Sequence, residues 1–491
     1  MHADEAVQAA RSRDLWQHGR YVYRPEEFHG PTLQYATLPS LWISGADHFA
    51  DTTKATYRIV PALFGIAAVL LLWLLADALG KPAVVCAGAL LALSPAVIYY
   101  NRYYIHQTLL MFFTLAAMAT AWRYFRSGRL RWCLAAGVCV GLMQSTKETA
   151  PLAYFAALVG LAMLLLWNRL LRERACEERV RRPRWHWVAA LGAAVLVAVV
   201  LYSSFFTNMR GPVDGVLAYL PWLQRAAGDS PHVRPWYYYL HLLAWWQLED
   251  GPPWSQAVVL LLAVAGFAAA LLPKKTFLPG ASAAFVRWLG FYTLTLTAVY
   301  SAVPYKTPWC LLQFLPGMIL LAGIGAVALV RWVPTWPLTA LTALVLLSAV
   351  GQLGWQSYLA NYKFPADQRN PYVYVHTGVK FEELAEQVQE LAEAWADQGD
   401  FSVAVVWHDE YYWPLPWYLR HDGPIRRLDR LPDGQNPAVV VASAQCNPAL
   451  AEQLADTHQM PSFYEMRPNV FVVLWVRKDV WQAHLQRLGR L

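Results

Sequence analysis

Two adjacent carboxylates near the start of the chain are the first residues whose types suit catalysis. Asp4 and Glu5 open an amphipathic pattern over residues 4–16, which predicts a helix. A carboxylate there could act as a general base that removes the proton of a hydroxyl group. Acidic residues are also common in the first turn of a helix, because they interact favourably with the helix dipole. Taken alone, the pair leaves both interpretations open.

Cations stand in the short polar links between apolar segments. Arg102, Lys147 and Lys306 each lie in a different link. An ionisable side chain near hydrocarbon depth is costly and is therefore a candidate functional group, although a long side chain can also extend to the interface. Three such cations on the same face as the carboxylate pair favour an anionic substrate. A lipid phosphate is the anion available at that depth.

Three histidines could add metal ligands or hydrogen bonds to the same face. His2, His29 and His106 accompany Asp4, and imidazole with carboxylate suits zinc or manganese. The histidines come from two separate loops, and no pair has the His-x-x-x-His spacing. A divalent metal is therefore a candidate cofactor, with hydrogen-bonding histidines as the alternative. No metal ligand is assigned.

An aromatic and charged cluster follows an expected strand near residue 403. Its members are His408, Asp409, Glu410, Trp413, Trp417 and Arg420. Aromatic rings beside acids and arginine can stack on a sugar ring, which would make this cluster an acceptor-side surface. The alternative is a proline-fixed loop that packs its tryptophans against the membrane domain.

Long apolar segments must position these residues. The chain has 491 residues, of which 57% are hydrophobic, with 24 Trp and 26 Tyr. Its apolar blocks are about 18 to 22 residues long, enough to cross a bilayer as a helix, and Trp and Tyr suit the membrane interface. We expect ten membrane helices, at 58–79, 83–99, 107–124, 131–146, 150–167, 186–206, 255–272, 285–303, 309–330 and 335–355.

The basic residues set the expected orientation. They underlie the net charge of +7 and cluster in short loops between apolar blocks, which indicates topology rather than a nucleic-acid surface. The loops at 126–131, 168–184 and 273–277 share one side by helix parity and are expected to be cytoplasmic. The carboxylates and the link cations then lie on the extracytoplasmic face. The sequence predicts a multi-pass cell-membrane protein that binds no nucleic acid.

Three regions follow from this topology. Residues 1–57 form a first extracytoplasmic loop, residues 58–360 the membrane domain, and residues 380–491 an extracytoplasmic C-terminal domain. A long outer loop at 207–254 is expected to be an interfacial helix or a lid over a lipid-linked donor. Because a polar first loop needs a preceding hydrophobic segment to cross the membrane, we also expect one further helix upstream.

The C-terminal region predicts a small α/β domain. Apolar runs there alternate with amphipathic stretches. Strands are expected at 403–407, 438–442 and 470–476, and helices at 381–396, 448–455 and 480–488. No Gly-rich phosphate loop follows a strand, so no nucleotide site is expected. The fold class is therefore an α-helical polytopic membrane protein with a small C-terminal α/β domain.

The polar motifs occur in an order that resembles a known group of membrane enzymes. They are Asp4-Glu5-Ala6, Gly19-Arg20-Tyr21, Gly30-Pro31, Tyr57-Arg58, Thr146-Lys147-Glu148 and Lys306-Thr307-Pro308-Trp309. This order resembles the GT-C glycosyltransferases of family 39, which are dolichyl-phosphate-mannose-protein mannosyltransferase-like enzymes. Within that group the chain is most similar to the branch named flippase-activity-associated proteins, whose motifs span almost the whole sequence.

The resemblance implies a GT-C-like fold and a sugar transfer. The expected reaction moves a sugar from a polyprenyl-phosphate donor to an acceptor hydroxyl group, with inversion of the anomeric carbon. By the same resemblance Asp4 is the base, with Glu5 as its neighbour or substitute. The cations expected to hold the leaving phosphate are Arg58, Arg102, Lys147 and Lys306.

Two departures from the family pattern keep other functions open. Gly30 replaces a lysine found in many relatives, and Gln107 replaces a glutamate. A second hypothesis is therefore a non-catalytic partner that flips or presents lipid-linked saccharides. A third is a transporter with carboxylates as proton relays, but the ionisable residues lie in links rather than mid-helix, and no two-half repeat is apparent. The expected partners are a lipid-linked sugar donor, membrane lipids, and an acceptor that is a protein, a lipid or a glycan.

Overall fold

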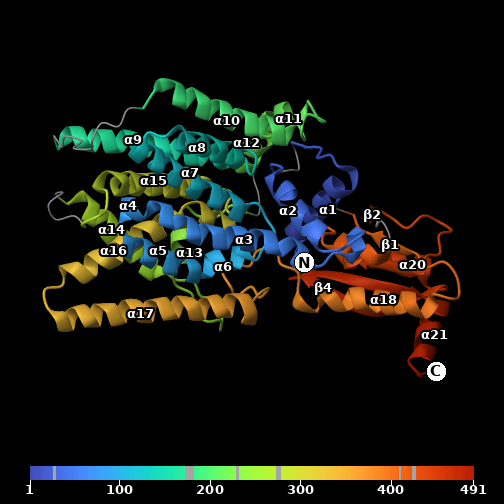
Figure 1. The fold of residues 1–491 in the computed structure, drawn as a ribbon. Helices are drawn as coiled ribbons and strands as arrows, with labels where there is room; N and C mark the ends of the chain where they lie inside the picture. The colour runs from blue at the N-terminus through green and yellow to red at the C-terminus, as the bar shows by residue number, and fades with distance from the viewer. Residues whose placement is uncertain are drawn as a thin grey trace. The chain divides into compact units, whose positions relative to one another are not determined.

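A computed structural model describes the chain at residues 1–25, 29–171, 182–227, 232–272, 278–408, 411–422 and 427–490. The chain divides into two compact units (Figure 1). The sheet unit comprises residues 1–13, 41–54 and 375–491, and the helical unit comprises residues 14–40 and 55–374. The expected first loop at 1–57 therefore contributes residues to both units.

The helical unit consists of helices joined by short links. Helices α1 (Ala3–His18) and α2 (Thr32–Ile43) precede its long series. The series begins with α3 (Lys54–Leu71), η2 (Leu72–Leu75), α4 (Ala76–Leu79), α5 (Lys81–Leu93), α6 (Pro95–Asn101), α7 (Gln107–Ser127), α8 (Leu130–Gln144), α9 (Ala150–Leu170) and α10 (Arg184–Tyr202). It continues with α11 (Gly211–Leu217), α12 (Tyr219–Ala227), α13 (Tyr238–Ala244), α14 (Ala257–Leu271), α15 (Ala283–Ala302), η4 (Pro308–Gln313), α16 (Leu315–Trp332), α17 (Trp336–Tyr358) and the π-helical turn η5 (Leu359–Lys363). Each of the ten expected segments is mainly helical, so the helical fold prediction is confirmed.

Six helices among the described residues are long and apolar enough to cross a membrane. They are Lys54–Leu79, Gln107–Ser127, Ala150–Leu170, Arg184–Tyr202, Leu315–Trp332 and Trp336–Lys363. Helices α5 and α6 would form one further span with a bend of 60°, because Pro95 cannot continue the hydrogen bonds of a helix. Helices α8 and α14 are shorter and apolar. The chain is thus a multi-pass membrane protein.

Helix α15 contains a buried charge that serves the end of a neighbouring helix. Arg287 is 1% exposed, and its Nε donates to the carbonyl oxygen of Ala270 at 2.6 Å. Its Nη2 donates to the carbonyl oxygen of Leu272 at 3.3 Å. These carbonyls belong to the last turn of α14, where helical partners are lacking. These hydrogen bonds explain why the charge of Arg287 is buried.

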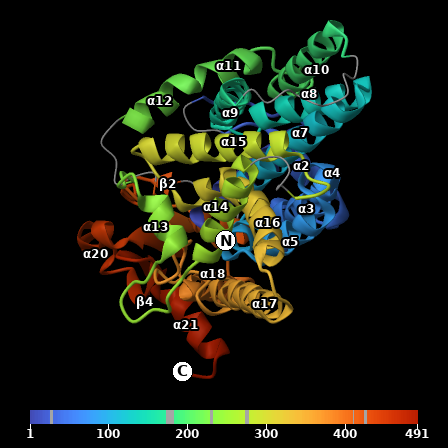
Figure 2. The ribbon, with the colours of Figure 1, turned by 90° about the vertical axis from the view of Figure 1, so that its left-hand side faces the viewer.

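Glycines let the central helices approach closely. Figure 2 shows α16 between α14 and α5. A Cβ on Gly266 of α14 would lie 2.0 Å from the carbonyl oxygen of Leu321, and one on Gly325 of α16 would lie 1.9 Å from that of Leu262. Small residues of this kind bring helix backbones together in membranes. Because α16 directly follows η4, this packing also fixes one end of the link that contains Lys306.

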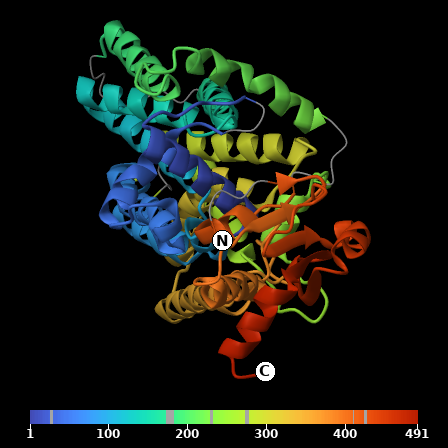
Figure 3. The same cartoon turned by 90° about the vertical axis from the view of Figure 1, so that its right-hand side faces the viewer.

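A five-stranded mixed sheet forms the core of the sheet unit (Figure 3). Its strands are β1 (Val403–Val406), β2 (Arg427–Leu428), β3 (Val439–Ser443), β4 (His458–Arg467) and β5 (Val470–Arg477), in the order β2-β1-β3-β5-β4. Strand β1 pairs in parallel with β2 and β3, whereas β5 pairs antiparallel with β3 and β4. Across the centre, Val441 lies opposite both Val405 and Leu474. All five residues of β3 are buried, as expected for a central strand.

Helices cover both faces of the sheet. Leu450 of α20 (Asn447–Leu454) joins a core cluster with Val440 of β3. The other face carries Tyr464 of β4, whose hydroxyl donates to Gln387 of α18 (Glu382–Trp395), and Figure 1 shows α18 alongside β4. Helix α21 (Lys478–Arg487) packs against α18. The shorter helical turns of this unit are η1 (Phe49–Asp51), η6 (Val379–Phe381), α19 (Leu415–Tyr418), η7 (Arg420–Asp422) and η8 (Ala444–Cys446).

Strands β2 and β4 are not predicted by the sequence pattern. Strand β4 lies at the sheet edge, contains Pro461, and shifts register between Gln459 and Ser462. A proline is tolerated at an edge because one side of the strand lacks ladder partners. The shift and the solvent-facing polar residues hide the alternation by which a strand is recognised.

Candidate active site

The acidic motif lies in the first turn of α1. The carbonyl oxygen of His2 accepts from the N–H of Ala6 at 2.9 Å, and the N–H of His2 donates to Glu5 Oε2 at 3.0 Å. A carboxylate that reaches back to the helix start in this way resembles half of a capping box. Glu5 is fully buried, whereas Asp4 in the same turn is partly exposed. Glu5 therefore has a structural task, and Asp4 is the residue of the pair that stays a candidate base.

His2 also has a structural contact within the sheet unit. Its Nδ1 accepts a hydrogen bond from the N–H of Thr377 at 3.0 Å. The rings of His2 and His376 lie with their centroids 4.0 Å apart. An Nδ1 that accepts from a backbone N–H belongs to a neutral imidazole. His2 thus attaches the start of α1 to the segment at 375–377.

A buried carboxylate is the centre of a polar cluster in the helical unit. Glu148, whose side chain is 5% exposed, accepts from His29 Nδ1 on Oε2 at 2.8 Å. Its Oε1 accepts from the hydroxyl of Tyr23 at 3.3 Å. Burial raises the pKa of Glu148, but the charge and hydrogen bond of His29 outweigh it and hold that pKa below its usual value. The carboxylate is therefore ionised and orients the His29 ring.

The second histidine of this unit extends the cluster. His106 is buried, and its Nε2 donates to the carbonyl oxygen of Gly30 at 3.0 Å. The rings of His29 and His106 meet edge to face, with centroids 5.2 Å apart. The structure thus brings together two of the three predicted histidines.

Gly30 lies too close to the neighbouring link for any side chain. A Cβ at this position would lie 2.0 Å from the carbonyl oxygen of Ser145. The same oxygen accepts from Thr32 Oγ1 at 2.7 Å and from Thr32 N at 3.1 Å. The glycine that departs from the family pattern is therefore required by the local packing, which excludes a lysine there.

Lys147 is a buried cation held by a neutral group. Its side chain is 7% exposed, and Nζ donates to Gln107 Oε1 at 2.8 Å. No carboxylate in the described ranges lies within ion-pair distance of this ammonium. The amide nitrogen of the buried Gln107 has no hydrogen-bond partner among the residues that the structure describes. A glutamate at position 107 would neutralise Lys147, whereas Gln107 leaves the positive charge available to an anion.

Lys306 forms a second buried cationic position in the helical unit. It is 2% exposed, and its ammonium donates to the carbonyl oxygen of Val303. Its backbone N–H donates to the carbonyl oxygen of His232 at 3.0 Å. The His232 ring bonds to the hydroxyl of Tyr374, and Tyr374 meets Trp309 edge to face at 4.9 Å. Burial lowers the pKa of Lys306.

The two predicted arginines lie on separate elements. Arg102 is exposed, and its Nη1 lies 3.2 Å from both the carbonyl and the side-chain oxygen of Asn361. Its guanidinium also stacks over the ring of Tyr362 at 5.0 Å. Arg58 is half-buried on α3, next to Tyr57, whose ring lies 5.2 Å from that of Tyr104.

The distal aromatic cluster is partly structural. Trp417 is 2% exposed and meets Phe49 edge to face at 5.7 Å. The Arg420 guanidinium lies 4.2 Å from the Trp417 ring centroid, and its Nη2 donates to the carbonyl oxygen of Thr52 at 3.0 Å. These contacts favour a packing role for both residues. His408 is exposed and Trp413 is half-buried, while Asp409 and Glu410 lie outside the described residues.

The fold of this chain is similar to that of known proteins. The family model described as dolichyl-phosphate-mannose-protein mannosyltransferase matches residues 33–210. The crystal structure of ArnT from Cupriavidus metallidurans bound to undecaprenyl phosphate has 15% identity and a TM-score of 0.62, and the match covers 96% of this chain and 93% of that chain. The chain has a GT-C-like fold.

An archaeal relative in fold supports the same conclusion. The oligosaccharyltransferase of Archaeoglobus fulgidus, tethered with an acceptor peptide, has 12% identity and a TM-score of 0.53 over 98% of this chain and 73% of that chain. The structure of AglB from the same organism, in complex with an inhibitory peptide and a dolichol-phosphate, has 12% identity and a TM-score of 0.50 over the same shares of the two chains. A comparison with curated protein sequences gave no match.

The described histidines of this GT-C-like chain belong to no group of three or more metal-ligating side chains. Within the part of the chain that the structure describes, no three His, Cys, Asp or Glu side chains converge on a common point. His29 donates to Glu148, and His106 donates to a backbone carbonyl. The candidate metal is therefore not supported by the donor set of the described residues.

Several residues of the polar cluster around Glu148 and Lys147 have no role predicted from the sequence. Glu148 and Tyr23 have no candidate role in the sequence, and Gln107 enters there only as a departure. One signal was available, because the carboxylate of Glu148 directly follows Lys147 in the sequence. A charged residue beside the lysine at membrane depth needs a partner. That partner, His29, lies in a distant segment.

Proposed function

We propose that this protein is a membrane glycosyltransferase. It transfers a sugar from a polyprenyl-phosphate donor to an acceptor hydroxyl group on the extracytoplasmic face, with inversion at the anomeric carbon. Lys147 is the observation that carries the proposal, because its buried ammonium contacts only a neutral amide among the described side chains. A buried charge needs an opposite charge or full hydrogen bonding. The position is therefore suited to an anionic phosphate.

Lys306 supports the same assignment. It is buried, and its ammonium has a backbone carbonyl rather than a carboxylate as its partner. A lysine ammonium binds phosphate as a point charge and requires no fixed orientation of the anion. Arg58 and Arg102 are proposed as further phosphate contacts.

The chemistry divides between a base and the cations. Asp4 removes the proton of the acceptor hydroxyl group. The acceptor oxygen then forms a bond to the anomeric carbon, while the bond between that carbon and the phosphate oxygen breaks. The electron pair of the broken bond leaves with the phosphate, where Lys147 and Lys306 stabilise the added charge. Attack on the face opposite the leaving group inverts the anomeric carbon. His29, oriented by Glu148, is proposed to hold the donor through its Nε2.

The lipid carrier is proposed from the structures that share the fold. ArnT was solved with undecaprenyl phosphate, and AglB with a dolichol-phosphate. Both ligands are polyprenyl phosphates, and a phosphate on a long apolar chain suits cations located beside membrane helices. The acceptor side is proposed to include His408, Asp409, Glu410 and Trp413.

Transfer from labelled donors tests the proposal. The wild type, Lys147→Met and the control Lys363→Met are compared in lipid nanodiscs with labelled polyprenyl-phosphate sugars. Lys363 is an exposed lysine of the same unit. The Lys147 variant is expected to lose about 100-fold in transfer rate, as expected for one removed electrostatic contact, while the control keeps the wild-type rate. Equal rates in all three proteins would overturn the phosphate assignment.

A non-catalytic partner role is distinguished by the same assay. Gln107 favours this alternative, because it stands where relatives have a glutamate. A partner that presents lipid-linked saccharides would bind the donor through Lys147 and release it unchanged. Donor binding without transfer in the wild type, for every donor and acceptor supplied, would establish that role instead.

A further inference from the structure

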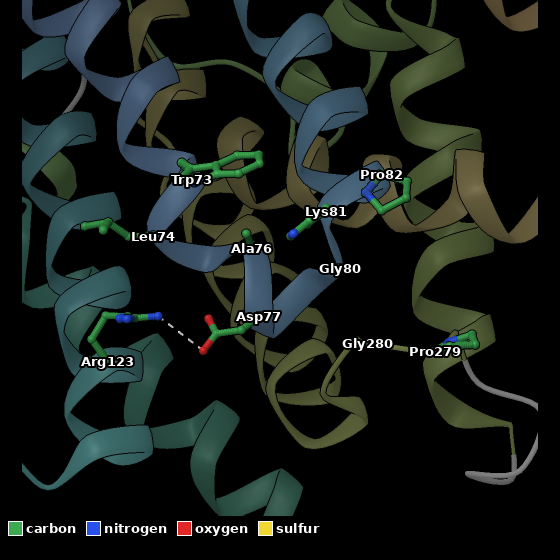
Figure 4. Close-up of a pocket in the computed structure, with 10 residues that line it drawn as sticks. All are labelled: Trp73, Leu74, Ala76, Asp77, Gly80, Lys81, Pro82, Arg123, Pro279 and Gly280. Carbon is green, nitrogen blue, oxygen red and sulfur yellow. Dashed lines mark hydrogen bonds and ion pairs between the residues drawn. The ribbon is translucent and has the colours of Figure 1, made fainter.

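A charged cavity lies at the end of the helical unit away from Lys147. It has a volume of about 570 Å³ and opens between the end of the α3–η2–α4 segment, the start of α5 and the loop before α15 (Figure 4). Gln107, the partner of Lys147, begins α7, whereas Arg123 of the cavity lies near the end of the same helix. At a rise of 1.5 Å per residue these two positions are about 24 Å apart. The cavity is therefore separate from the proposed transfer site.

The carboxylate of the cavity, Asp77, is paired with arginine. Asp77 accepts from Arg123 Nη1 on Oδ2 at 3.2 Å and from Trp122 Nε1 on Oδ1 at 3.0 Å. Arg126 Nε lies 3.8 Å from the same Oδ2. Two guanidinium groups thus share one carboxylate, which leaves this group of residues with an excess of positive charge.

Lys81 adds a further cation to the lining of the cavity. It is exposed and forms no hydrogen bond or ion pair with any residue in the described part of the chain. Figure 4 shows its side chain directed into the space bordered by Trp73 and Asp77. Lys81 is also the first residue of α5, so the positive end of that helix dipole adds to its charge.

The backbone around the cavity is held in place. Gly80 has a φ of +85°, a conformation that favours glycine, and it turns the chain sharply between α4 and α5. The N–H of Ser282 donates to the carbonyl oxygen of Ala78 at 2.8 Å, which fixes the loop of Pro279 and Gly280 against α4. The cations are therefore presented by a fixed frame.

An exposed apolar stripe runs along α3 and into η2, where it reaches this cavity. It consists of Ile59, Leu63, Ile66, Leu70 and Trp73, whose exposed fractions range from 43% to 71%. Spacings of four and three residues place these side chains on one face of the helix. Trp73 belongs to both the stripe and the cavity wall, which suits an aromatic ring at the boundary between headgroups and hydrocarbon.

We propose that this cavity binds the phosphate headgroup of an anionic membrane phospholipid, with its acyl chains along the α3 stripe. The positive excess selects a phosphate group, and the apolar stripe selects a lipid over a free anion. Basic pockets between membrane helices bind anionic headgroups in this way. A lipid bound in this cavity contacts α3, α5 and α7 and is expected to stabilise the helical unit. It takes no part in sugar transfer.

Lipid binding by the intact protein tests the proposal. Purified wild type, Lys81→Met, Lys81→Arg and the control Lys363→Met are titrated with phosphatidylglycerol, phosphatidylcholine and inorganic phosphate. Bound lipid is counted by native mass spectrometry, and the midpoint of thermal unfolding is followed. Phosphatidylglycerol is expected to bind and to raise the midpoint. Loss of the Lys81 charge should weaken this binding about fivefold, as expected for one cation near a membrane surface. Lys81→Arg and Lys363→Met should bind as the wild type does.

Each other result overturns part of the proposal. Equal binding of phosphatidylcholine would exclude selection for an anionic headgroup. Equal protection by inorganic phosphate would show an anion site that needs no lipid. Unchanged phosphatidylglycerol binding in Lys81→Met would remove the cavity as the binding site.

Discussion

The imidazole of His29 and the carboxylate of Glu148 form a hydrogen-bonded pair, with 2.8 Å between Nδ1 and Oε2, that joins segments 119 residues apart. The carboxylate is buried, while the imidazole is 38% exposed. Because Nδ1 is bonded to Glu148, Nε2 is the nitrogen that a ligand can reach. The pair thus presents an oriented imidazole in the same cluster as Lys147.

Replacing Glu148 by Gln removes the charge and keeps the shape. We expect the transfer rate to fall about tenfold to 100-fold, because His29 loses the carboxylate that orients its ring. Glu452→Gln, an exposed change on α20, is the control and should keep the wild-type transfer rate. A wild-type transfer rate in Glu148→Gln would contradict this role of Glu148.

The same pair makes stability depend on pH. The pKa of Glu148 is held below its usual value of about 4.3. A lowered carboxyl pKa contributes stability above that usual value, and the contribution is lost as the pH falls through the folded-state pKa. We expect the wild type to exceed Glu148→Gln in free energy of unfolding by about 1 to 2 kcal/mol near neutral pH. Denaturant titrations should show this difference shrinking below about pH 4.

Lys306 predicts an alkaline limit for donor binding. Burial lowers the pKa of its ammonium, and phosphate binding needs the charged form. The KM for the donor is therefore expected to rise at a pH below the usual lysine value of about 10.4. Lys306→Arg stays charged throughout and should remove this rise. The KM is measured between about pH 7 and pH 10 in both proteins, and the same rise in the arginine variant would contradict the assignment.

Gln107→Glu places a carboxylate beside Lys147 and tests the role of the Lys147 charge. The new carboxylate would form an ion pair with the Lys147 ammonium, which in the wild type donates to Gln107 Oε1. We expect donor affinity to fall about tenfold, because an ion pair neutralises the cation that the phosphate needs. Gln445→Glu on the surface of the sheet unit is the matched control. Tighter donor binding in the Gln107 variant would argue that the position acts on the sugar or acceptor.

Gly30→Ala tests the contact between the first segment and the link at 145–148. A Cβ at Gly30 would lie 2.0 Å from Ser145 O, so the backbone must move. We expect a loss of about 1 to 3 kcal/mol in the free energy of unfolding and reduced transfer. Gly192→Ala in α10 meets no atom within 4 Å and should be neutral or stabilising. A wild-type free energy of unfolding in Gly30→Ala would show that the link is adaptable.

The sequence predicts the helices well because long apolar blocks signal membrane spans directly. It also predicts the strands β1, β3 and β5, each of which contains a continuous run of buried residues. It does not predict β4, whose proline and register shift remove the alternation. Local pattern is sufficient where one segment carries the signal by itself.

Candidate site residues are harder to rank from sequence because their roles depend on distant partners. Asp4 and Glu5 are equivalent by residue type, and only the family resemblance favours Asp4 as the base. The structure adds the bond from His2 N to Glu5 Oε2, which gives Glu5 a capping role. Likewise, Trp417 and Arg420 are residue types that often bind sugars. In the structure, however, Trp417 packs against Phe49 and Arg420 bonds to the carbonyl oxygen of Thr52. Residue type indicates a class of chemistry, whereas the fold decides which residues are available for it.

The most direct test of the account is sugar transfer by the intact chain and by Asp4→Asn in lipid nanodiscs. Each protein is supplied with a panel of labelled polyprenyl-phosphate sugars and with protein, lipid and glycan acceptors. The account predicts transfer by the wild type with at least one donor, and a loss of about 100-fold or more in Asp4→Asn, as expected when a general base is removed. Transfer at the wild-type rate by Asp4→Asn, or none by the wild type with any donor, would contradict it.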